Sequence, residues 1–380
     1  MSKTILNKYF LDNKIKIAHL SSAHPRDDIR VFKKMCSSLA ESGLKTNYVV
    51  ADGKGDECKN GVNIHDVGLA ESRMSRILCS SKAVYRKALK LDCDLYHFHD
   101  PELWPYAYLL KRKRKVVVFD AHEDLPKALL SKYYLNKVSA HILAGFASLI
   151  EKFVCSRLDH VVGATPSITK KYSLLNRATN INNYPILGEF APLPEKSEQG
   201  EIIYLGEISQ IRGIKQIVQS LEQLEDVRLN LAGNFVNQGF RKELESLKGW
   251  KKVKYWGHVD RTEARNLLSR SSVALVTFLP EPNHLDSQPN KIFEYMSAGL
   301  PIVLSDFPLW NEIVETHKCG VCVNPKDPNR IAHAVAQLLD DPTVARKMGE
   351  NGVNAIEEVF NWKSESFKLF KLYDEILKSG

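Results

Sequence analysis

Two kinds of hydrophobic pattern alternate along the chain. Short runs of β-branched and apolar residues, typical of buried strands, are followed by segments in which apolar residues recur every three or four positions, typical of amphipathic helices. In the first half, the runs predict strands at Lys16 to Leu20, Thr46 to Ala51, Leu95 to His97, Val116 to Asp120 and His160 to Gly163. The helical patterns between them predict repeated β-α units, which form a parallel sheet covered by helices.

A second series of the same kind follows residue 200. Its predicted strands are Ile202 to Leu205, Val227 to Ala232, Val253 to Tyr255, Val273 to Leu279, Ile302 to Ser305 and Gly320 to Val323. Between the two series, residues 188–200 are rich in Pro and Gly and lack periodicity, which predicts a linker. We therefore expect a first domain over 1–187, a second over 201–358 and a terminal helical segment over 359–380.

This organisation predicts the fold class and the place of the chemistry. A chain of 380 residues is long enough for two domains of typical size. We expect an α/β protein with two Rossmann-like domains facing across a cleft. Ligands bind such sheets at the carboxyl ends of the strands. No G-x-G-x-x-G follows an early strand, which disfavours a dehydrogenase.

The charge is unevenly distributed. With 44% hydrophobic and 26% charged residues, the composition is that of a folded protein and excludes a disordered one. Residues 1–190 contain 30 Lys and Arg against 19 Asp and Glu, a net charge of +11, whereas the whole chain carries +8. Lys111 to Lys115 are five consecutive cations, and residues 127–158 mix Lys with Leu and Tyr. An anionic membrane surface, a phosphorylated substrate or nucleic acid would explain this basic half, and a solvated edge is the alternative for Lys111 to Lys115.

No membrane span or export signal is predicted. The longest uncharged apolar run, Ile142 to Ile150, is shorter than the roughly 18 residues that cross a bilayer. The first residues lack the apolar core of a signal peptide, and the seven cysteines are scattered, which fits a reducing cytoplasm. We expect a cytoplasmic protein that lies against the inner face of the cell membrane.

The most informative motif is DSQPNKIFEYMSAGLP, from Asp286 to Pro301. Pro289 suits the first turn of a helix, and the Gly-x-Pro sequence ends that helix. Lys291, Glu294 and Tyr295 fall at i, i+3 and i+4 and are predicted to share one face. A helix N-terminus attracts an anion such as a diphosphate, and a carboxylate one turn further can hold ribose hydroxyls. The motif therefore predicts a nucleotide-sugar site.

The segment resembles the donor-site motif of the retaining glycosyltransferases of family 4, which have the GT-B fold of two Rossmann domains. That motif contains two Glu separated by seven residues; Glu294 matches the second, and Asp286 replaces the first. The resemblance implies that Asp286 contacts the donor sugar, while Asn290 and Glu294 bind the nucleotide. In the family the last helix crosses back onto the first domain, as we expect for 359–380.

A loop after the first strand of the second domain extends the resemblance. The family carries two cations there for the donor diphosphate. Here Arg212 matches the second cation, with Arg in place of Lys, whereas the first position is occupied by Gly206-Glu207. Lys291 is expected to supply the missing charge, and the Arg fork suits phosphate geometry. Gly206, Arg212 and Lys291 are thus predicted to hold the diphosphate, with both cations assisting its departure.

Three polar segments end strands of the first domain. His122 matches a family histidine beside the donor sugar; capping of the next helix is the alternative. His97 and His99 have metal-like spacing, but the sequence marks no third ligand, so a structural or acceptor-side role is favoured. Arg26 and Arg30 either meet a pyrophosphate or pair with the aspartates between them.

The resemblance implies transfer of a hexosyl or N-acetylhexosaminyl group, with retention, from a nucleotide diphosphate sugar. We expect UDP rather than GDP, and a lipid-linked saccharide of O-antigen, capsule or exopolysaccharide synthesis as acceptor. No cofactor and no metal are expected, because protein cations face the diphosphate. The alternatives are a nucleotide-sugar epimerase of the same fold, which needs no acceptor, and a non-catalytic basic protein that binds membranes or nucleic acid.

Overall fold

The computed structural model describes residues 15–130, 136–192 and 200–379. Its chain divides into two compact units. Unit 1 combines Met1–Asn183 with Trp362–Gly380, and unit 2 is Tyr184–Asn361. Part of the predicted linker, residues 193–199, lies outside the described residues.

Unit 1 is built on an eight-stranded sheet with the order β3-β4-β2-β1-β5-β6-β7-β8. The strands are β1 (Lys16–Leu20), β2 (Lys45–Val50), β3 (Glu57–Lys59), β4 (Val62–Asp66), β5 (Leu95–Phe98), β6 (Val116–Ala121), β7 (His160–Gly163) and β8 (Ala178–Asn180). Neighbours are parallel except β3 and β4. The strand order reverses between β1 and β5, so the ligand-binding edge of this sheet is expected there.

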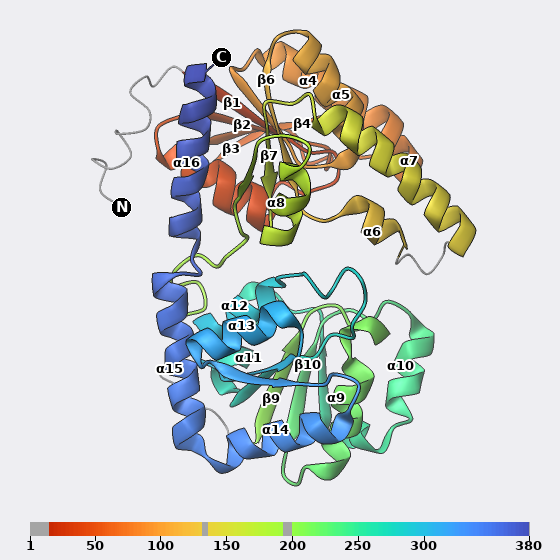
Figure 1. Cartoon of the computed structure of the whole chain (residues 1–380), viewed down its shortest axis with the longest axis vertical. Coiled ribbons are helices and arrows are strands. Elements are labelled where there is room, and N and C mark those ends of the chain that lie inside the picture. The colour runs from red at the N-terminus through yellow and green to blue at the C-terminus, as the bar shows by residue number, and fades with distance from the viewer. Residues whose placement is uncertain (1–14, 131–135, 193–199, 380) are drawn as a thin grey trace. The chain divides into compact units, whose positions relative to one another are not determined.

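Helices cover both faces of this sheet (Figure 1). They are η1 (a π-helical segment, Ile29–Cys36), α2 (Ser37–Glu41), α3 (Arg73–Ser75), η2 (Arg76–Ser80), α4 (Ser81–Leu91), η3 (Pro101–Leu103), α5 (Trp104–Arg112), α6 (Leu125–Leu130), α7 (Lys137–Cys155), α8 (Pro166–Ser173) and α16 (Trp362–Ser379). Although α16 ends the chain, it packs on η1 within unit 1.

Unit 2 contains a six-stranded, wholly parallel sheet with the order β11-β10-β9-β12-β13-β14. The strands are β9 (Glu201–Leu205), β10 (Arg228–Ala232), β11 (Val253–Gly257), β12 (Val273–Val276), β13 (Ile302–Ser305) and β14 (Gly320–Val323). In sequence order this is 3-2-1-4-5-6, the order of dinucleotide-binding folds. The reversal between β9 and β12 marks the expected ligand site of unit 2.

The helices of unit 2 connect these strands. They are η4 (Gln210–Arg212), α9 (Ile214–Ser220), η5 (Leu221–Gln223), α10 (Gln238–Glu245), η6 (Lys248–Lys252), α11 (Arg261–Arg270), α12 (Asn290–Ser297), α13 (Pro308–His317), α14 (Pro328–Asp340) and α15 (Pro342–Glu358). Strands β9, β12 and β13 are buried at every position, because helices cover both faces of a parallel sheet.

The predicted fold class is confirmed, since each unit is a parallel α/β sheet covered by helices. Several elements were not predicted, among them the β3–β4 pair, α8, β8 and α13. The β3–β4 pair has no apolar signal in β3, whose residues are all exposed. Helix α13 has a readable signal, because Pro308 opens it and Trp310, Ile313 and Val314 are buried at helical spacing.

Candidate active site

In unit 2, the loops that follow β9 and β12 border the reversal of strand order. The first loop runs from Gly206 through η4 to Gly213. Gly213 has a φ of +72°, and a Cβ atom at this position would overlap the carbonyl oxygen of Thr277, which directly follows β12. Only glycine fits both conditions. The two loops are therefore held in direct contact, with Arg212 at their junction.

Lys291 lies directly against the backbone that follows β9. A Cβ atom on Gly206, whose φ is +125°, would overlap Cε and Nζ of Lys291. The ammonium group lies 5.7 Å from the Tyr204 ring and 5.8 Å from the Phe278 ring. Burial, and after it the charge of Arg212, lower the pKa of Lys291 to about 8. The structure thus brings Gly206, Arg212 and Lys291 together.

Arg212 and Lys291 are neighbouring cations, and Glu294 and Glu207 lie near enough to oppose the lowering of the Lys291 pKa by burial without forming an ion pair with it. The Arg212 guanidinium stacks 4.2 Å from the Phe278 ring centroid, and no ion pair of either cation occurs among the described residues. Buried polar atoms of the same loops also lack hydrogen-bond partners, namely Ser209 Oγ, Arg212 Nε, Thr277 Oγ1, His284 Nε2 and Gln288 Oε1. Uncompensated charge and unpaired polar atoms are costly, so an anionic, oxygen-rich ligand fits this place.

Helix α12 positions Lys291 because its opposite face is packed in the core. Ile292 and Met296 are fully buried, as their spacing predicted. Tyr295 is also buried, and its hydroxyl accepts a hydrogen bond from the Leu205 N–H over 2.8 Å. Tyr295 therefore ties α12 to the end of β9 and does not share an open face with Lys291. The helix begins at Asn290, after Pro289, with no side-chain cap on its first N–H groups.

The two motif carboxylates differ in their surroundings. Glu294 is half-buried, and its Oε1 lies 3.5 Å from a guanidinium nitrogen of Arg261, which makes a shorter contact of 2.5 Å with Glu189. Glu294 thus keeps acceptor capacity one turn beyond Lys291. Asp286 lies in the exposed loop before the helix. Their roles toward a nucleotide sugar stay predictions.

In unit 1, His122 follows β6 and is held by a buried carboxylate. Asp120 accepts hydrogen bonds from the Arg30 guanidinium over 2.9 and 2.7 Å and from His122 Nε2 over 2.8 Å. Burial raises the pKa of Asp120, but Arg30 and His122 outweigh burial and lower it well below its usual value. His122 is partly exposed, and its Nδ1 is the nitrogen left for a ligand. Such a carboxylate fixes one tautomer and the orientation of the ring.

A second histidine–carboxylate pair lies beside the first. His24 Nδ1 is 2.9 Å from Asp100, and the His24 ring is 4.8 Å from the His122 ring. Asp100 also accepts hydrogen bonds of 2.7 Å from the Ser21 hydroxyl and the Ser22 N–H. Burial opposes a charge on His24, but the hydrogen bond to Asp100 prevails and raises its pKa. The sequence marked the segment of Arg26 and Arg30, but it gave no sign that His24 pairs with Asp100.

Both predictions for Arg26 and Arg30 were wrong. Arg26 is bound by Asp52 over 2.8 and 2.7 Å, and Arg30 by Asp120, so neither is open to a pyrophosphate. The local partners are also wrong, because the Asp28 side chain accepts from the Val31 N–H and caps η1. Partners distant in the sequence bind both guanidinium groups, although Arg30 Nη1 is buried without a hydrogen-bond partner.

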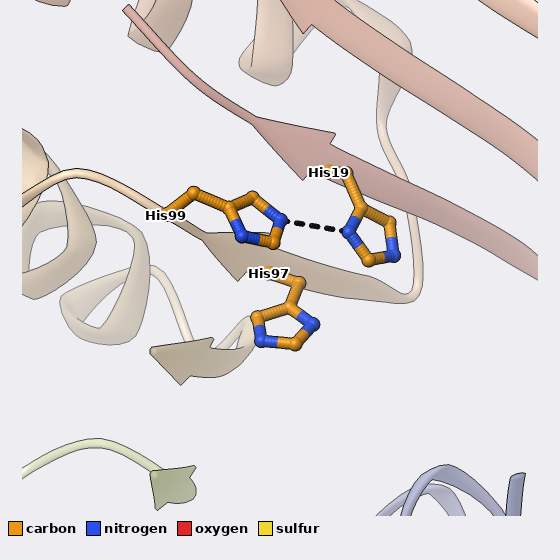
Figure 2. Close-up of side chains that lie close together, drawn as sticks. All are labelled: His19, His97 and His99. Carbon is orange, nitrogen blue, oxygen red and sulfur yellow. Dashed lines mark hydrogen bonds between the residues drawn. The ribbon is translucent and has the colours of Figure 1, made fainter. Parts of the chain in front are cut away.

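His97 and His99 have a third histidine beside them that the sequence did not mark. His19 on β1 pairs in register with His97 on β5, and its Nδ1 lies 2.8 Å from His99 Nε2 (Figure 2). The spacing within one segment gave no sign of His19, since only the strand order places β1 beside β5. By distance the three rings form one possible metal-binding group, and His99, Asp120 and His122 form another.

Helix α7 corrects the prediction that no segment has the length and composition of a membrane span. Its window Val138–Cys155 passes that test with a mean hydropathy of 1.4, and 33% of the window is buried within the protein. The prediction required an uncharged run, whereas this window includes Glu151 and Lys152.

Two family models match successive parts of the chain. The model "Glycosyltransferase Family 4" matches residues 30–174, and "Glycosyl transferases group 1" matches residues 188–355. The chain belongs to the family 4 glycosyltransferases. Members of this family are retaining glycosyltransferases, and a nucleotide sugar is the donor.

Similar proteins support the family and its fold. Glycogen synthase of Mycobacterium tuberculosis is 24% identical over 356 residues, covering 84% of this chain and 81% of the relative. Sucrose-phosphate synthase from Thermosynechococcus elongatus is 18% identical with a TM-score of 0.79, covering 97% and 100% of the two chains. Anabaena HepE, solved in complex with UDP-glucose, is 15% identical with a TM-score of 0.72, covering 95% and 100%. These structures show the GT-B fold.

Proposed function

We propose that unit 2 binds the diphosphate of a UDP-sugar on Arg212, Lys291 and the N-terminus of α12. The observation that carries this proposal is the pair of neighbouring cations that forms no ion pair among the described residues. A diphosphate supplies charge for both cations and acceptors for the unpaired donors. UDP is the proposed nucleotide because HepE, a protein of the same fold, was solved with UDP-glucose.

The same cations favour the chemical step. When the bond to the anomeric carbon breaks, negative charge grows on the departing phosphate, where preorganised cations stabilise it most. Lys291 is protonated below its pKa of about 8, and a bound diphosphate raises that pKa further. The acceptor hydroxyl attacks from the face of the leaving group and passes its proton to a phosphate oxygen, so the configuration is retained.

The remaining motif residues receive roles from their places. Glu294, one turn beyond Lys291, accepts hydrogen bonds from the ribose hydroxyls, and Asn290 contacts the nucleotide at the start of the helix. Asp286 and His122 contact the transferred sugar. His122 is suited to this because Asp120 holds its Nε2 and leaves Nδ1 for the ligand.

Calorimetric titration with UDP tests the donor site. Arg212→Ala should weaken UDP binding by about 1.5–3 kcal/mol, the range of a hydrogen bond to a charged group. The matched control is Lys215→Ala, on the same segment, where the cation is already paired with Glu243. Lys215→Ala should bind UDP like the unaltered protein. Equal UDP affinity of Arg212→Ala and the unaltered protein would contradict the site.

We further propose that the acceptor is a saccharide on a polyprenyl diphosphate, reached by a peripheral contact of unit 1 with the inner membrane face. Helix α7 supports this with an exposed apolar face. Val138, Ile142, Phe146 and Leu149 are 71%, 66%, 63% and 69% exposed and recur at helical spacing. Isolated exposed apolar residues are ordinary, whereas a contiguous stripe marks an interaction surface.

The charges around this face fit an anionic surface. Lys152 is exposed, and Arg157 stacks 3.9 Å from the Phe153 ring at the end of α7. The carboxylate of this helix, Glu151, is buried and bound by Tyr172, so it does not repel anionic lipid. Apolar residues with cations at their margin are typical of helices that lie in a membrane interface.

Co-sedimentation with vesicles tests the membrane contact. Replacing Phe146 and Leu149 by Ser should reduce binding to anionic vesicles, and salt should weaken the binding of the unaltered protein. The control is Leu69→Ser, which alters an equally exposed leucine (73%) in the loop after β4. Binding that ignores lipid charge, or an equal loss in the control, would favour an acceptor free in solution.

A further inference from the structure

A buried polar cluster occupies the strand-order reversal of unit 1. His19 and His97 are fully buried, and His99 is almost so. Figure 2 shows their rings side by side, from β1 and from β5 with the residues that follow it. Tyr373 of α16 reaches the same cluster and is fully buried as well. Buried polar groups are costly unless they are hydrogen-bonded, so the donors and acceptors here are strongly constrained.

The charge of Asp120 determines the direction of the hydrogen bonds. As a carboxylate it can only accept, so His99 Nδ1–H donates to it over 3.1 Å. Burial lowers the pKa of His99 to about 3, which keeps the ring neutral and leaves its Nε2 as an acceptor. That nitrogen accepts from His19 Nδ1–H over 2.8 Å.

The same reasoning reaches Tyr373. Burial lowers the pKa of His19, so its ring is neutral and its Nε2 is an acceptor. The Tyr373 hydroxyl, whose pKa is raised by burial, lies 3.3 Å from this nitrogen and donates its proton to it. His97 Nδ1–H, 2.5 Å away, then donates to the Tyr373 oxygen. One directed chain of hydrogen bonds thus runs from α16 to the carboxylate that holds His122.

A metal ion is the competing occupant, because the three imidazoles offer nitrogen atoms within 4.8 Å of one another. The geometry argues against it. The His19 and His99 rings lie edge to edge with 17° between their planes, so the facing Nδ1 and Nε2 atoms point at each other across their hydrogen bond of 2.8 Å and not at a shared point. Both nitrogens of His19 and of His99 are already used in hydrogen bonds.

We propose that Tyr373 is a positioning residue for His122, acting through His19, His99 and Asp120. Asp120 sets the tautomers of His99 and His19, and the hydrogen bond from the hydroxyl to His19 Nε2 stabilises this arrangement, in which His99 Nδ1–H helps to hold the Asp120 carboxylate. Without the hydroxyl, His19 gains access to its other tautomer, which presents an acceptor to the His99 acceptor. The effect on transfer rests on the proposed role of His122.

Tyr373→Phe removes the hydroxyl and keeps the ring. We expect kcat to fall about 10-fold, the lower end of the range for lost outer-shell partners, with an unchanged KM for the donor. The matched control is Tyr172→Phe, which removes another buried hydroxyl of unit 1. That hydroxyl is bound to Glu151 and takes no part in the hydrogen-bond network of Tyr373. This control variant should lose similar stability and keep its kcat. An equal fall of kcat in both variants would overturn the proposal.

A spectroscopic readout tests the network independently of turnover. In protein labelled with 15N-histidine, His19 and His99 should each show a single Nδ1–H tautomer, and Tyr373→Phe should give a mixture. Unchanged tautomers in this variant would overturn the proposal. So would a stoichiometric bound metal in the purified protein, since a ligated nitrogen takes no part in these hydrogen bonds.

His122→Ala separates this inference from the proposed function. If His122→Ala retains full turnover, the role of His122 in transfer fails, but the tautomer measurement still tests the network. Tyr373→Phe must then also retain full turnover, and a fall in its kcat would overturn the route through His122.

Discussion

The two candidate sites of this protein balance their charges in opposite ways. In unit 2, Arg212 and Lys291 lie close together and form no ion pair among the described residues, although Glu294 and Glu207 lie near enough to oppose the lowering of the Lys291 pKa by burial. In unit 1, the buried carboxylates Asp100 and Asp120 are bound by cations, histidines, hydroxyls or backbone N–H groups. Unit 2 therefore has excess positive charge that an anion can balance. Unit 1 has a network that is closed around its carboxylates, although Arg30 Nη1 and His97 Nε2 are buried without partners.

This difference indicates what each site contributes. A site with excess positive charge is destabilised until its ligand arrives, so it gains binding free energy from an anion. A closed network gains little from a charged ligand but holds its partly exposed histidines in fixed orientations. We therefore expect substitutions in unit 1 to affect folding and turnover, and substitutions in unit 2 to affect donor binding.

The largest effect is expected from Asp120→Asn. This change leaves the buried Arg30 without its carboxylate, and breaking a buried ion pair from one side costs about 3–5 kcal/mol. Urea denaturation measures the loss in the free energy of unfolding. Asp286→Asn, at an exposed position, is the control and should stay within about 0.5 kcal/mol. A loss below about 1 kcal/mol for Asp120→Asn would mean that the network is not closed.

The second effect concerns turnover. His122→Ala should lower kcat about 100-fold, as expected for loss of a side chain that acts in proton transfer or charge stabilisation. UDP affinity should not change, because the groups proposed to hold the nucleotide belong to unit 2. Single-turnover kinetics with a UDP-sugar and UDP calorimetry give the two values. Loss of UDP affinity in this variant would show that His122 contributes to nucleotide binding and not to turnover alone.

The third effect is a pH dependence of donor binding. Burial and Arg212 lower the pKa of free Lys291 to about 8, whereas a bound diphosphate favours its protonated form. Above pH 8 binding must take up a proton, so UDP affinity should fall by up to about tenfold per pH unit. Lys291→Arg keeps its charge at these pH values and should flatten the curve. Calorimetry at pH 7, 8 and 9 measures the UDP affinity of both proteins. The same pH dependence in Lys291→Arg and in the unaltered protein would contradict the contact between Lys291 and the diphosphate.

The smallest effect is expected from Arg212→Ala on folding. Its removal breaks no ion pair and relieves repulsion with Lys291, so the free energy of unfolding should change by no more than about 0.5 kcal/mol or should rise. Urea denaturation without nucleotide measures it. A loss of several kcal/mol would show that Arg212 is a structural residue, and the contrast between the units would disappear.

The local sequence predicted helix α12 well. Pro289 before α12, the buried spacing of Ile292 and Met296, and the placement of Lys291 all depend on residues within three turns. The parallel sheets were likewise readable, since strands covered on both faces consist of short apolar runs. The buried position of Tyr295 could not be predicted from the sequence, because only packing against β9 gives its hydroxyl the Leu205 N–H as partner.

The contacts of the histidine site could not be predicted from local sequence patterns. His19 and His99 are 80 residues apart, and Tyr373 is 354 residues from His19, so no spacing rule connects them. Arg30 likewise pairs with Asp120, 90 residues away, and not with the nearby Asp28.

The sequence by itself determined which segments are strands and helices, because hydrophobic period and turn residues act over a few positions. Only the tertiary structure decided which strand ends meet. That choice follows from the order of strands in the sheet, which brings β1 beside β5, and from the packing of α16, which brings Tyr373 to His19. The pairing of buried charges then follows, because each must find a partner wherever the fold provides one.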